Sequence, residues 1–256
     1  MEGRLRVANL SVQYGPIKAV EAVHLSIEPG NLTGLIGPNG AGKTSLIDAV
    51  TGFAPSTGEV LLNEHDISGL APTERSRAGL ARTWQSTMLF DDLTVEENIT
   101  VASGTTPWWR ATAAVFRGRR SDSSAANALL VDLGIEALAR LRPSSLAPGQ
   151  RKLVGIARAL AANPAVVCLD EPAAGLNTEE SASLGALLRR TADRGLTTLL
   201  VDHDMSLVLS VCDSVVVLDK GRLIFAGTPK QVQSDPTVIE AYLGSGVHSG
   251  EGSRAS

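Results

Sequence analysis

Residues 32–44 read LTGLIGPNGAGKT, an apolar run followed by a glycine-rich loop. The run predicts a short buried strand over Leu32–Ile36, and apolar residues three and four positions apart predict a helix over Lys43–Thr51. Between them, Gly37–Thr44 matches the pattern G-x-x-x-x-G-K-[ST]. A strand before this pattern and a helix after it distinguish a phosphate-binding loop from a chance glycine-rich turn. The segment therefore predicts a nucleotide site in an α/β fold.

The residue types of this loop explain how it would hold a nucleotide. Glycines let the backbone fold into a cradle whose N–H groups face phosphate oxygens. The helix that follows points its positive end at the same charge. Lys43 has the length to reach the β- and γ-phosphates, and the Thr44 hydroxyl can bind Mg²⁺. The predicted nucleotide-contacting residues are Gly37, Asn39, Gly40, Gly42, Lys43, Thr44 and Ser45.

Two adjacent carboxylates mark the end of a second apolar run, predicted as a buried strand over Ala165–Asp170. In nucleotide-hydrolysing proteins with a phosphate-binding loop, an Asp at a strand end helps to hold Mg²⁺. Asp170 is therefore a predicted metal ligand. Glu171 lies one residue further on, where it can act as the general base on a water in line with the γ-phosphate. An acidic pair at the protein surface is the alternative interpretation.

A histidine stands at the end of a third apolar run. His203 follows the strand predicted over Thr197–Val201. We expect this strand to lie beside the one that ends in Asp170, which would bring the imidazole near the γ-phosphate. A histidine with a purely structural role is the alternative.

The remaining pattern divides the chain into three parts. The first third predicts strands over Leu5–Tyr14, Ala19–Ile27 and Gly58–Ile67. The middle, from Pro72 to about Leu141, is mostly helical in pattern. The last third alternates strands and helices, which predicts a mostly parallel sheet covered by helices.

Composition narrows the class of protein. The 256 residues include 23 Lys and Arg against 27 Asp and Glu, and a net charge of −4 argues against broad binding to nucleic acid. No apolar run approaches the roughly 18 residues of a membrane span, and the charged segment Met1–Arg6 has no signal-peptide core. The two cysteines, Cys168 and Cys212, lie in apolar segments and predict free thiols in a reducing cytosol.

Taken in order, these motifs resemble the nucleotide-binding subunit of an ABC transporter over about Arg4–Leu243. The resemblance implies a P-loop NTPase fold of the ABC ATPase type. Such a fold has a mixed-sheet RecA-like core, an antiparallel β subdomain and a helical subdomain, here near residues 87–160. The resemblance also implies that Tyr14 stacks on adenine, that Gln85 senses Mg²⁺ and the attacking water, and that His203 is the switch histidine.

The family signature corresponds to Leu146–Gln150, which reads LAPGQ where the family usually has LSGGQ. Ala147 lacks the hydroxyl that would donate to a γ-phosphate, and Pro148 lacks a backbone N–H. Gly149 and the start of a helix near Gln150 keep an anion site. The resemblance implies that Ala147, Gly149 and Gln150 contact the nucleotide bound by a partner, and the departure predicts a weaker contact.

Several phrases resemble the ATPase subunits of branched-chain amino-acid importers, the Liv type. They are LARTWQ at 80–85, LF at 89–90, LTVEEN at 93–98, EPAAGLN at 171–177, DHDM at 202–205 and VIEAYLG at 238–244. The last residue of the 171–177 phrase, Asn177, stands where many members have Asp. This closer resemblance implies an ATPase that uses ATP and Mg²⁺ at the cytoplasmic face of the membrane.

The same resemblance implies the partners. They are integral-membrane permease subunits, a second and different ATPase subunit, and indirectly a substrate-binding protein, with no nucleic acid. A homodimer is the alternative to two different ATPases. Other functions left open are urea or amide uptake, lipid export, a weakly hydrolysing regulatory subunit, and a soluble cassette in DNA repair or translation.

Two segments fall outside this scheme. Trp108 and Trp109 lie among arginines, which predicts either a patch near the membrane or permease, or a flexible insertion with partly buried tryptophans. Residues 244–256 are rich in Gly and Ser and predict a flexible tail after a single domain of residues 4–243.

Overall fold

An antiparallel sheet occupies the N-terminal side of this computed structural model, which describes residues 3–83, 89–103 and 124–246. Its strands lie in the order β2-β1-β4-β5. They are β1 Leu5–Tyr14, β2 Ile17–Ile27, β4 Thr57–Leu62 and β5 His65–Asp66. The prediction of a single strand over Gly58–Ile67 was wrong. Asn63 and Glu64 both have positive φ, 51° and 64°, so the chain reverses there into a tight hairpin.

A six-stranded sheet forms the centre of the molecule, in the order β10-β9-β3-β8-β7-β6. Its strands are β3 Leu32–Ile36, β6 Leu80–Arg82, β7 Val166–Asp170, β8 Thr197–Val201, β9 Ser214–Asp219 and β10 Arg222–Gly227. All neighbours are parallel except β9 and β10. The predicted α/β fold with a mostly parallel sheet is confirmed. The helical pattern from Pro72 to Leu141 hid β6, because three residues are too few to show a period.

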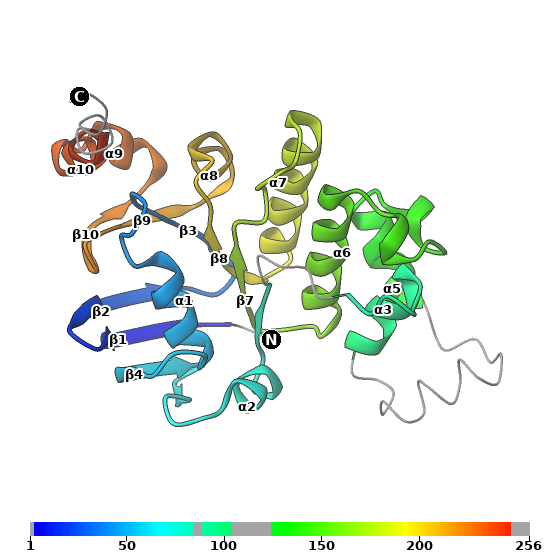
Figure 1. Ribbon diagram of the computed structural model, residues 1–256, viewed down its shortest axis with the longest axis horizontal. Coiled ribbons are helices and arrows are strands. Elements are labelled where there is room, and N and C mark those ends of the chain that lie inside the picture. Colours follow the sequence, from blue (N-terminus) through cyan, green and yellow to red (C-terminus); the bar gives the residue numbers. More distant parts are fainter. Residues whose placement is uncertain (1–2, 84–88, 104–123, 247–256) are drawn as a thin grey trace, which may run out of the picture.

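Helices cover the sheet and extend to one side, where α3, α5 and α6 lie beyond α7 (Figure 1). Their bounds are α1 Lys43–Thr51, α2 Pro72–Arg77, α3 Val95–Ala102, α5 Ser124–Asp132, α6 Pro148–Ala161, α7 Thr178–Asp193, α8 Met205–Val211, α9 Pro229–Ser234 and α10 Pro236–Gly246, with 3₁₀ turns at Glu136–Leu138 and Pro143–Ser145. Helix α10 runs through the first three residues of the predicted tail, and the rest of the tail lies outside the described residues.

Two hydrophobic layers enclose the central sheet, and β7 shows how one strand serves both. Val166 and Cys168 pack with the layer under the antiparallel sheet, whereas Val167 and Leu169 pack with the layer of α6, α7 and α8. Successive side chains of a strand point to opposite faces, so a strand buried on both sides reads as a continuous apolar run. Because β3, β7 and β8 are parallel, the segments that follow these three buried strands emerge at the same end of the sheet.

The two cysteines are buried free thiols, as predicted. Burial raises the pKa of each thiol to about 12. Neither Cys168 nor Cys212 is therefore a thiolate at neutral pH, which removes them as nucleophiles.

Candidate nucleotide site

The glycine-rich loop joins β3 to α1, as the pattern predicts. A side chain at Gly37 would lie 2.1 Å from the carbonyl oxygen of Leu218, and one at Gly42 would lie 2.2 Å from that of Ala19. Both glycines also have positive φ, 154° and 102°. These two positions need glycine because the loop lies directly against the backbone of neighbouring strands. The loop is thereby held in place before any nucleotide arrives.

The Lys43 side chain hydrogen-bonds to the backbone of its own loop. Its Nζ donates to the carbonyl oxygens of Gly37 at 2.7 Å and Pro38 at 2.9 Å. Burial lowers the pKa of Lys43, while the negative charges of Glu171 and Asp170 act in the opposite direction. Lys43 therefore interacts electrostatically with both carboxylates.

The first turn of α1 offers the other donors. The first N–H groups of a helix have no partner within it, so those at Lys43, Thr44 and Ser45 are available to an anion. Asn39 and Gly40 are exposed on the loop and Thr44 is exposed at the helix start. The predicted phosphate-contacting residues are thus brought together on one short segment.

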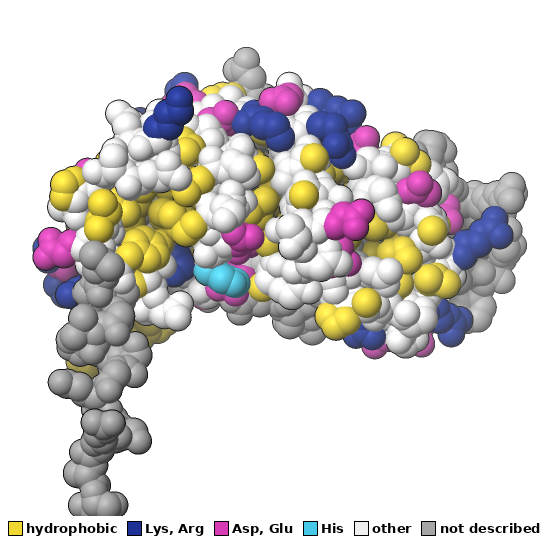
Figure 2. Space-filling view, turned by 90° about the horizontal axis from the view of Figure 1, so that it is seen from above, with side chains coloured by type: hydrophobic (Ala, Val, Ile, Leu, Met, Phe, Trp, Pro, Cys, Tyr) yellow, Lys and Arg dark blue, Asp and Glu magenta, His cyan; other side chains and the backbone are white. Residues whose placement is uncertain are grey.

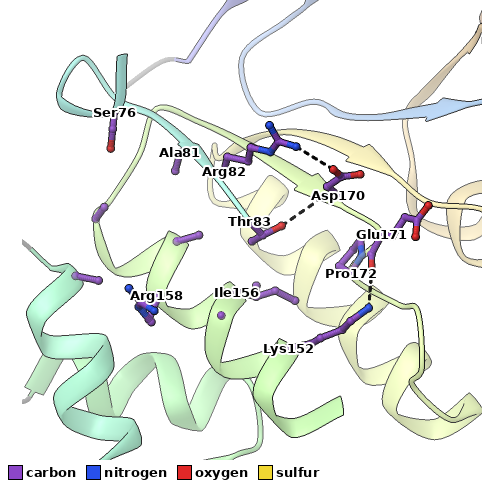
Figure 3. A pocket seen from close by; sticks show the side chains of 14 residues that line it. Ser76, Ala81, Arg82, Thr83, Lys152, Ile156, Arg158, Asp170, Glu171 and Pro172 are labelled. Carbon is purple, nitrogen blue, oxygen red and sulfur yellow. Dashed lines mark hydrogen bonds and ion pairs between the residues drawn. The ribbon is translucent and has the colours of Figure 1, made fainter. Parts of the chain in front are cut away.

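Asp170 ends β7 with its carboxylate almost completely buried. Its Oδ2 accepts from Arg82 Nη2 at 3.0 Å, and its backbone N–H donates to the Thr83 hydroxyl at 3.2 Å (Figure 3). Its Oδ1 is buried and has no hydrogen-bond partner among the described residues. Burial raises the pKa of Asp170, while Arg82 opposes the rise. A buried carboxylate oxygen without a donor is what a cation site requires.

Glu171 follows in a strained backbone conformation, with φ at +48°. Its N–H donates to the Val201 carbonyl at 2.7 Å, and its own carbonyl accepts from Lys152 Nζ at 3.0 Å. A non-glycine residue with positive φ costs free energy and persists only where its neighbours hold it. Both backbone groups are fixed here, and the Glu171 carboxylate points away from Lys152 (Figure 3).

His203 lies two residues after β8, which is parallel and adjacent to both β3 and β7. Its side chain is 65% exposed, and Nδ1 lies 3.6 Å from Asp202 Oδ1, beyond hydrogen-bond distance. The imidazole is therefore accessible from solvent. The expectation that its strand lies beside the Asp170 strand is confirmed.

Asp202 is a residue that the sequence reasoning did not single out. It is 1% exposed, and its two oxygens accept from the N–H groups of Ala173 and Asp204, each at 3.0 Å. It therefore joins the loop after Glu171 to the segment that carries His203. The available signal was a carboxylate directly after an apolar strand, the same signal that identified Asp170.

The signature segment forms the start of α6, which begins at Pro148 rather than near Gln150. The Gln150 side chain turns back and accepts from the Ala147 N–H at 3.0 Å. The same construction opens α2, where Glu74 accepts from the Ala71 N–H at 2.8 Å before a proline at the first helical position. The sequences APGQ and APTE are thus the same local helix start.

Asn177 caps α7. Its side chain accepts from the Glu180 N–H at 2.9 Å, and Glu180 accepts from the Asn177 N–H at 3.0 Å. Gly149 lies against this turn, because a side chain at Gly149 would meet Leu176 at 2.9 Å and Glu180 at 3.1 Å. The signature turn is therefore packed on the start of α7.

Four predicted residues remain to be placed. Tyr14 ends β1 and is 46% exposed, so its ring is open to a partner. Gln85 and the pair Trp108 and Trp109 lie outside the described residues, and their predicted roles stay predictions.

A cavity of about 350 Å³ lies between the edge of the central sheet and α6 (Figure 3). Its lining includes Arg82, Thr83, Lys152, Arg158 and Asp170. Arg158 also lies over the ring of Phe90, 5.1 Å from its centroid. The metal-ligand candidate Asp170 therefore lines a cavity on the side of α6.

Comparison with known families matches two parts of the chain. Residues 20–174 match the ABC transporter family, and residues 222–248 match the branched-chain amino acid ATP-binding cassette transporter family. The chain is 38% identical to the high-affinity branched-chain amino acid transport ATP-binding protein BraF of Pseudomonas aeruginosa, over 94% of this chain and 97% of that protein. It is 37% identical to the corresponding LivG protein of Escherichia coli strain K12, with the same coverage.

A third relative has another role. The lipopolysaccharide export system ATP-binding protein LptB of Escherichia coli strain K12 is 35% identical, again over 94% of this chain and 97% of that protein. Among solved structures, a nucleotide-free ATP-binding cassette from an ABC transporter aligns with a TM-score of 0.82 and 31% identity, over 94% of this chain and 99% of that chain. A cassette in the ADP conformation aligns with a TM-score of 0.81 and 31% identity, over 95% and 100%.

The ordered motifs, the α/β fold and these similarities agree over nearly the whole chain. The chain belongs to the ABC transporter family and is one of its ATP-hydrolysing cassettes.

Proposed function

We propose that this chain powers an importer that takes up branched-chain or related amino acids through a separate permease. One observation carries the catalytic part. The strands β3, β7 and β8 are adjacent and parallel, so Lys43, the Asp170–Glu171 pair and His203 all follow carboxyl ends at one edge of the sheet. Ligands bind at that edge in open α/β sheets.

The substrate class rests on similarity. Residues 222–248, which include β10, α9 and α10, match the family of branched-chain amino acid cassettes. BraF and LivG, whose names state branched-chain amino acid transport, are the relatives at 38% and 37% identity. These similarities support the same substrate class for the transporter to which this chain contributes.

The residues present fit Mg²⁺ together with a nucleotide. Among the described residues, no group of three or more His, Cys, Asp or Glu side chains could hold a metal by itself. Mg²⁺ in proteins is commonly held by one or two carboxylates plus substrate phosphates. The unpartnered Asp170 Oδ1 and the exposed Thr44 hydroxyl supply the oxygen ligands, with Gln85 as a third. When bound, Mg²⁺ would neutralise phosphate charge.

In this proposal each side chain has a distinct task. Lys43 exchanges its two carbonyl partners for β- and γ-phosphate oxygens, and the amides of the first α1 turn bind the same phosphates. Glu171 accepts a proton from the attacking water. His203 donates to the γ-phosphate as negative charge spreads over its oxygens. Tyr14 stacks on the adenine, and its exposed ring supports that role.

The partners follow from the subunit's place in a transporter. Among residues 3–83, 89–103 and 124–246, no helix is long and apolar enough to cross a membrane. We infer a peripheral position at the cytoplasmic face, with permease subunits contacting the segment that contains Gln85. On the face in Figure 2, basic and acidic side chains are interspersed, which fits a protein partner better than nucleic acid.

A second ATPase subunit completes the site. Ala147, Gly149 and Gln150 would face the nucleotide held by that subunit, mainly through the backbone N–H groups of α6. We expect a heterodimer. Light scattering on Glu171→Gln with Mg-ATP tests this point. A monomer that still binds ATP requires a different partner ATPase, whereas an ATP-dependent dimer of this chain alone contradicts the heterodimer.

Lipid export is the second candidate, because LptB is 35% identical over the same coverage. The deciding experiment measures uptake of labelled leucine and export of labelled lipid by cells of the source organism that lack this chain. Loss of leucine uptake, restored by the wild-type chain, is the expected result. Normal leucine uptake with a defect in lipid transport would replace the proposed substrate class.

The catalytic assignment is tested on this chain assembled with its partner ATPase. Glu171→Gln keeps the size and hydrogen-bonding shape of the side chain but cannot accept the proton. We expect hydrolysis to fall by about 100-fold, the lower range for a lost general base, while ATP binding is retained. A variant with wild-type hydrolysis would show that Glu171 is not the base. Glu179→Gln, at an exposed position on α7, is the matched control.

A further inference from the structure

Arg82 is a buried arginine held between two carboxylates. Its side chain is 6% exposed, and that of Asp170 is 2% exposed. One nitrogen, Nη2, donates to Asp170 Oδ2 at 3.0 Å, and the other, Nη1, donates to Asp48 on α1 and to the Thr51 hydroxyl at 3.3 Å. The guanidinium therefore bridges the end of β7 to the end of α1.

The two carboxylate oxygens of Asp170 differ in their contacts. Oδ2 is taken by Arg82, and Oδ1 has no hydrogen-bond partner among the described residues. A guanidinium is planar and presents its donors in a rigid fork, so two anchored ends fix its orientation. Because the fork holds Oδ2, it also fixes where Oδ1 points. Groups that orient a metal ligand in this way control metal affinity without touching the metal.

The strand that carries Arg82 holds Asp170 at a second point. β6 is the edge strand of the central sheet, and the Thr83 hydroxyl accepts from the Asp170 N–H at 3.2 Å. The Thr83 N–H donates in turn to the Cys168 carbonyl at 2.9 Å. The carboxylate of Asp170 is thus held by Arg82 of β6 and its backbone N–H by Thr83, the residue after β6, as Figure 3 shows.

A simple ion pair is the competing explanation. Burying two charges together often adds little net stability, and removing one partner leaves the other uncompensated. An arginine that served only to balance charge would not need to contact one oxygen of Asp170 and leave the other without a donor. Asp170 already has a partner, and the oxygen left over lies at the end of β7 beside Glu171 and within the charge range of Lys43. Arg82 can therefore orient the Asp170 carboxylate as well as neutralise its charge.

We propose that Arg82 is a positioning residue for Asp170, holding Oδ2 so that Oδ1 is presented to the Mg²⁺ that accompanies ATP. This inference rests on the proposed function, in which Asp170 is a Mg²⁺ ligand.

The test compares two buried arginines that are both packed on the end of α1. Arg82→Lys keeps a positive charge but cannot bridge both carboxylates. Arg75→Lys is the matched control, because Arg75 is 3% exposed and donates to the carbonyls of Ala49 at 2.8 Å and Val50 at 2.7 Å without touching Asp170. Calorimetry with a non-hydrolysable ATP analogue measures affinity in EDTA and across a Mg²⁺ series.

We expect Arg82→Lys to raise the half-saturating Mg²⁺ concentration by about 10-fold, the lower range for residues that orient metal ligands. Its affinity for the analogue in EDTA should stay unchanged, and Arg75→Lys should leave the Mg²⁺ dependence as in wild type even if its melting temperature falls. An unshifted Mg²⁺ dependence in Arg82→Lys overturns the proposal. An equal shift in Arg75→Lys, or an equal loss of affinity in EDTA, also overturns it.

Two further variants keep the outcome decisive. If Arg82→Lys does not fold, Asp48→Ala removes the acceptor that anchors Nη1, and a Mg²⁺ dependence unchanged in that variant overturns the inference. Asp170→Asn tests the underlying assignment separately. If Asp170→Asn leaves the Mg²⁺ dependence unchanged, the proposed metal ligand is wrong. If Asp170→Asn shifts it and Arg82→Lys does not, only the positioning role of Arg82 fails.

Discussion

At the carboxyl end of β7, Asp170 is held by side chains from β6 and the residue after it, whereas the first turn of α6 is held by its own Gln150. The first region is buried and built from distant segments. The second is a local helix start that recurs at α2. The Asp170 region, which would serve this chain's own nucleotide, is therefore held by tertiary contacts. The signature turn, which would face a partner's nucleotide, is held by local backbone geometry. The effects of substitutions should therefore be larger in the first region than in the second.

The largest expected effect is that of Lys43→Met, in the phosphate-binding loop of this chain's own nucleotide site. The variant removes the only charge that Lys43 offers to phosphate, and a hydrogen bond between charged groups contributes about 1.5–3 kcal/mol. We expect ATP affinity to fall by about 10- to 100-fold in calorimetry, the range to which that free energy corresponds. Lys18→Met, at an exposed lysine paired with Glu21 at 3.2 Å, serves as control and should bind normally. Binding within a factor of three of wild type by Lys43→Met would contradict the assignment.

Asp202→Ala should cost the most stability. It leaves the N–H groups of Ala173 and Asp204 without their carboxylate, which is worth about 2 kcal/mol of unfolding free energy for buried groups. Urea unfolding measures the loss. Asp193→Ala, at a side chain 62% exposed, should change stability by less than about 0.5 kcal/mol. Equal losses in the two variants would show that the link between β7 and β8 contributes no more than a surface ion pair.

Asn177→Ala lies between the two regions, at the turn of α7 on which Gly149 packs. Loss of the cap should lower the unfolding free energy by about 1 kcal/mol. Asn177→Asp keeps the acceptor and should remain within about 0.5 kcal/mol of wild type, because Asp caps as well as Asn. If Asn177→Asp is as destabilised as Asn177→Ala, the cap does not explain why Asn is tolerated here.

The smallest effect is expected from Ala147→Ser in the signature turn. The hydroxyl adds a cap to α6 and should raise the unfolding free energy by about 0.5 kcal/mol, or the melting temperature by about 1–2 °C. Ala71→Ser at the matching start of α2 should give a similar gain. Only Ala147→Ser should also strengthen ATP-dependent association with a partner ATPase. A gain in association by both variants would remove the distinction between the two turns.

Much of the fold was open to prediction because its strands are buried on both faces. The runs that became β3, β7 and β8 show no alternation. β7 ends at Asp170, β8 is followed by Asp202, and β3 is followed by the glycine-rich loop that begins at Gly37. The short strand β6 was missed, since Leu80–Arg82 gains its structure from pairing with β7. The hairpin at Asn63 and Glu64 was also missed, because neither residue is the glycine that usually announces such a turn.

Local sequence pattern identified the phosphate-binding loop, Asp170, Glu171 and His203. A loop motif or a strand end consists of consecutive residues, so it can be recognised without the fold. The bridge from Asp48 through Arg82 to Asp170, and the link through Asp202, were decided only by tertiary structure. Their members are up to 122 residues apart in the 48–170 case, and no local period relates them. Packing alone brings such residues together, since a buried carboxylate must find its donors wherever the folded chain supplies them.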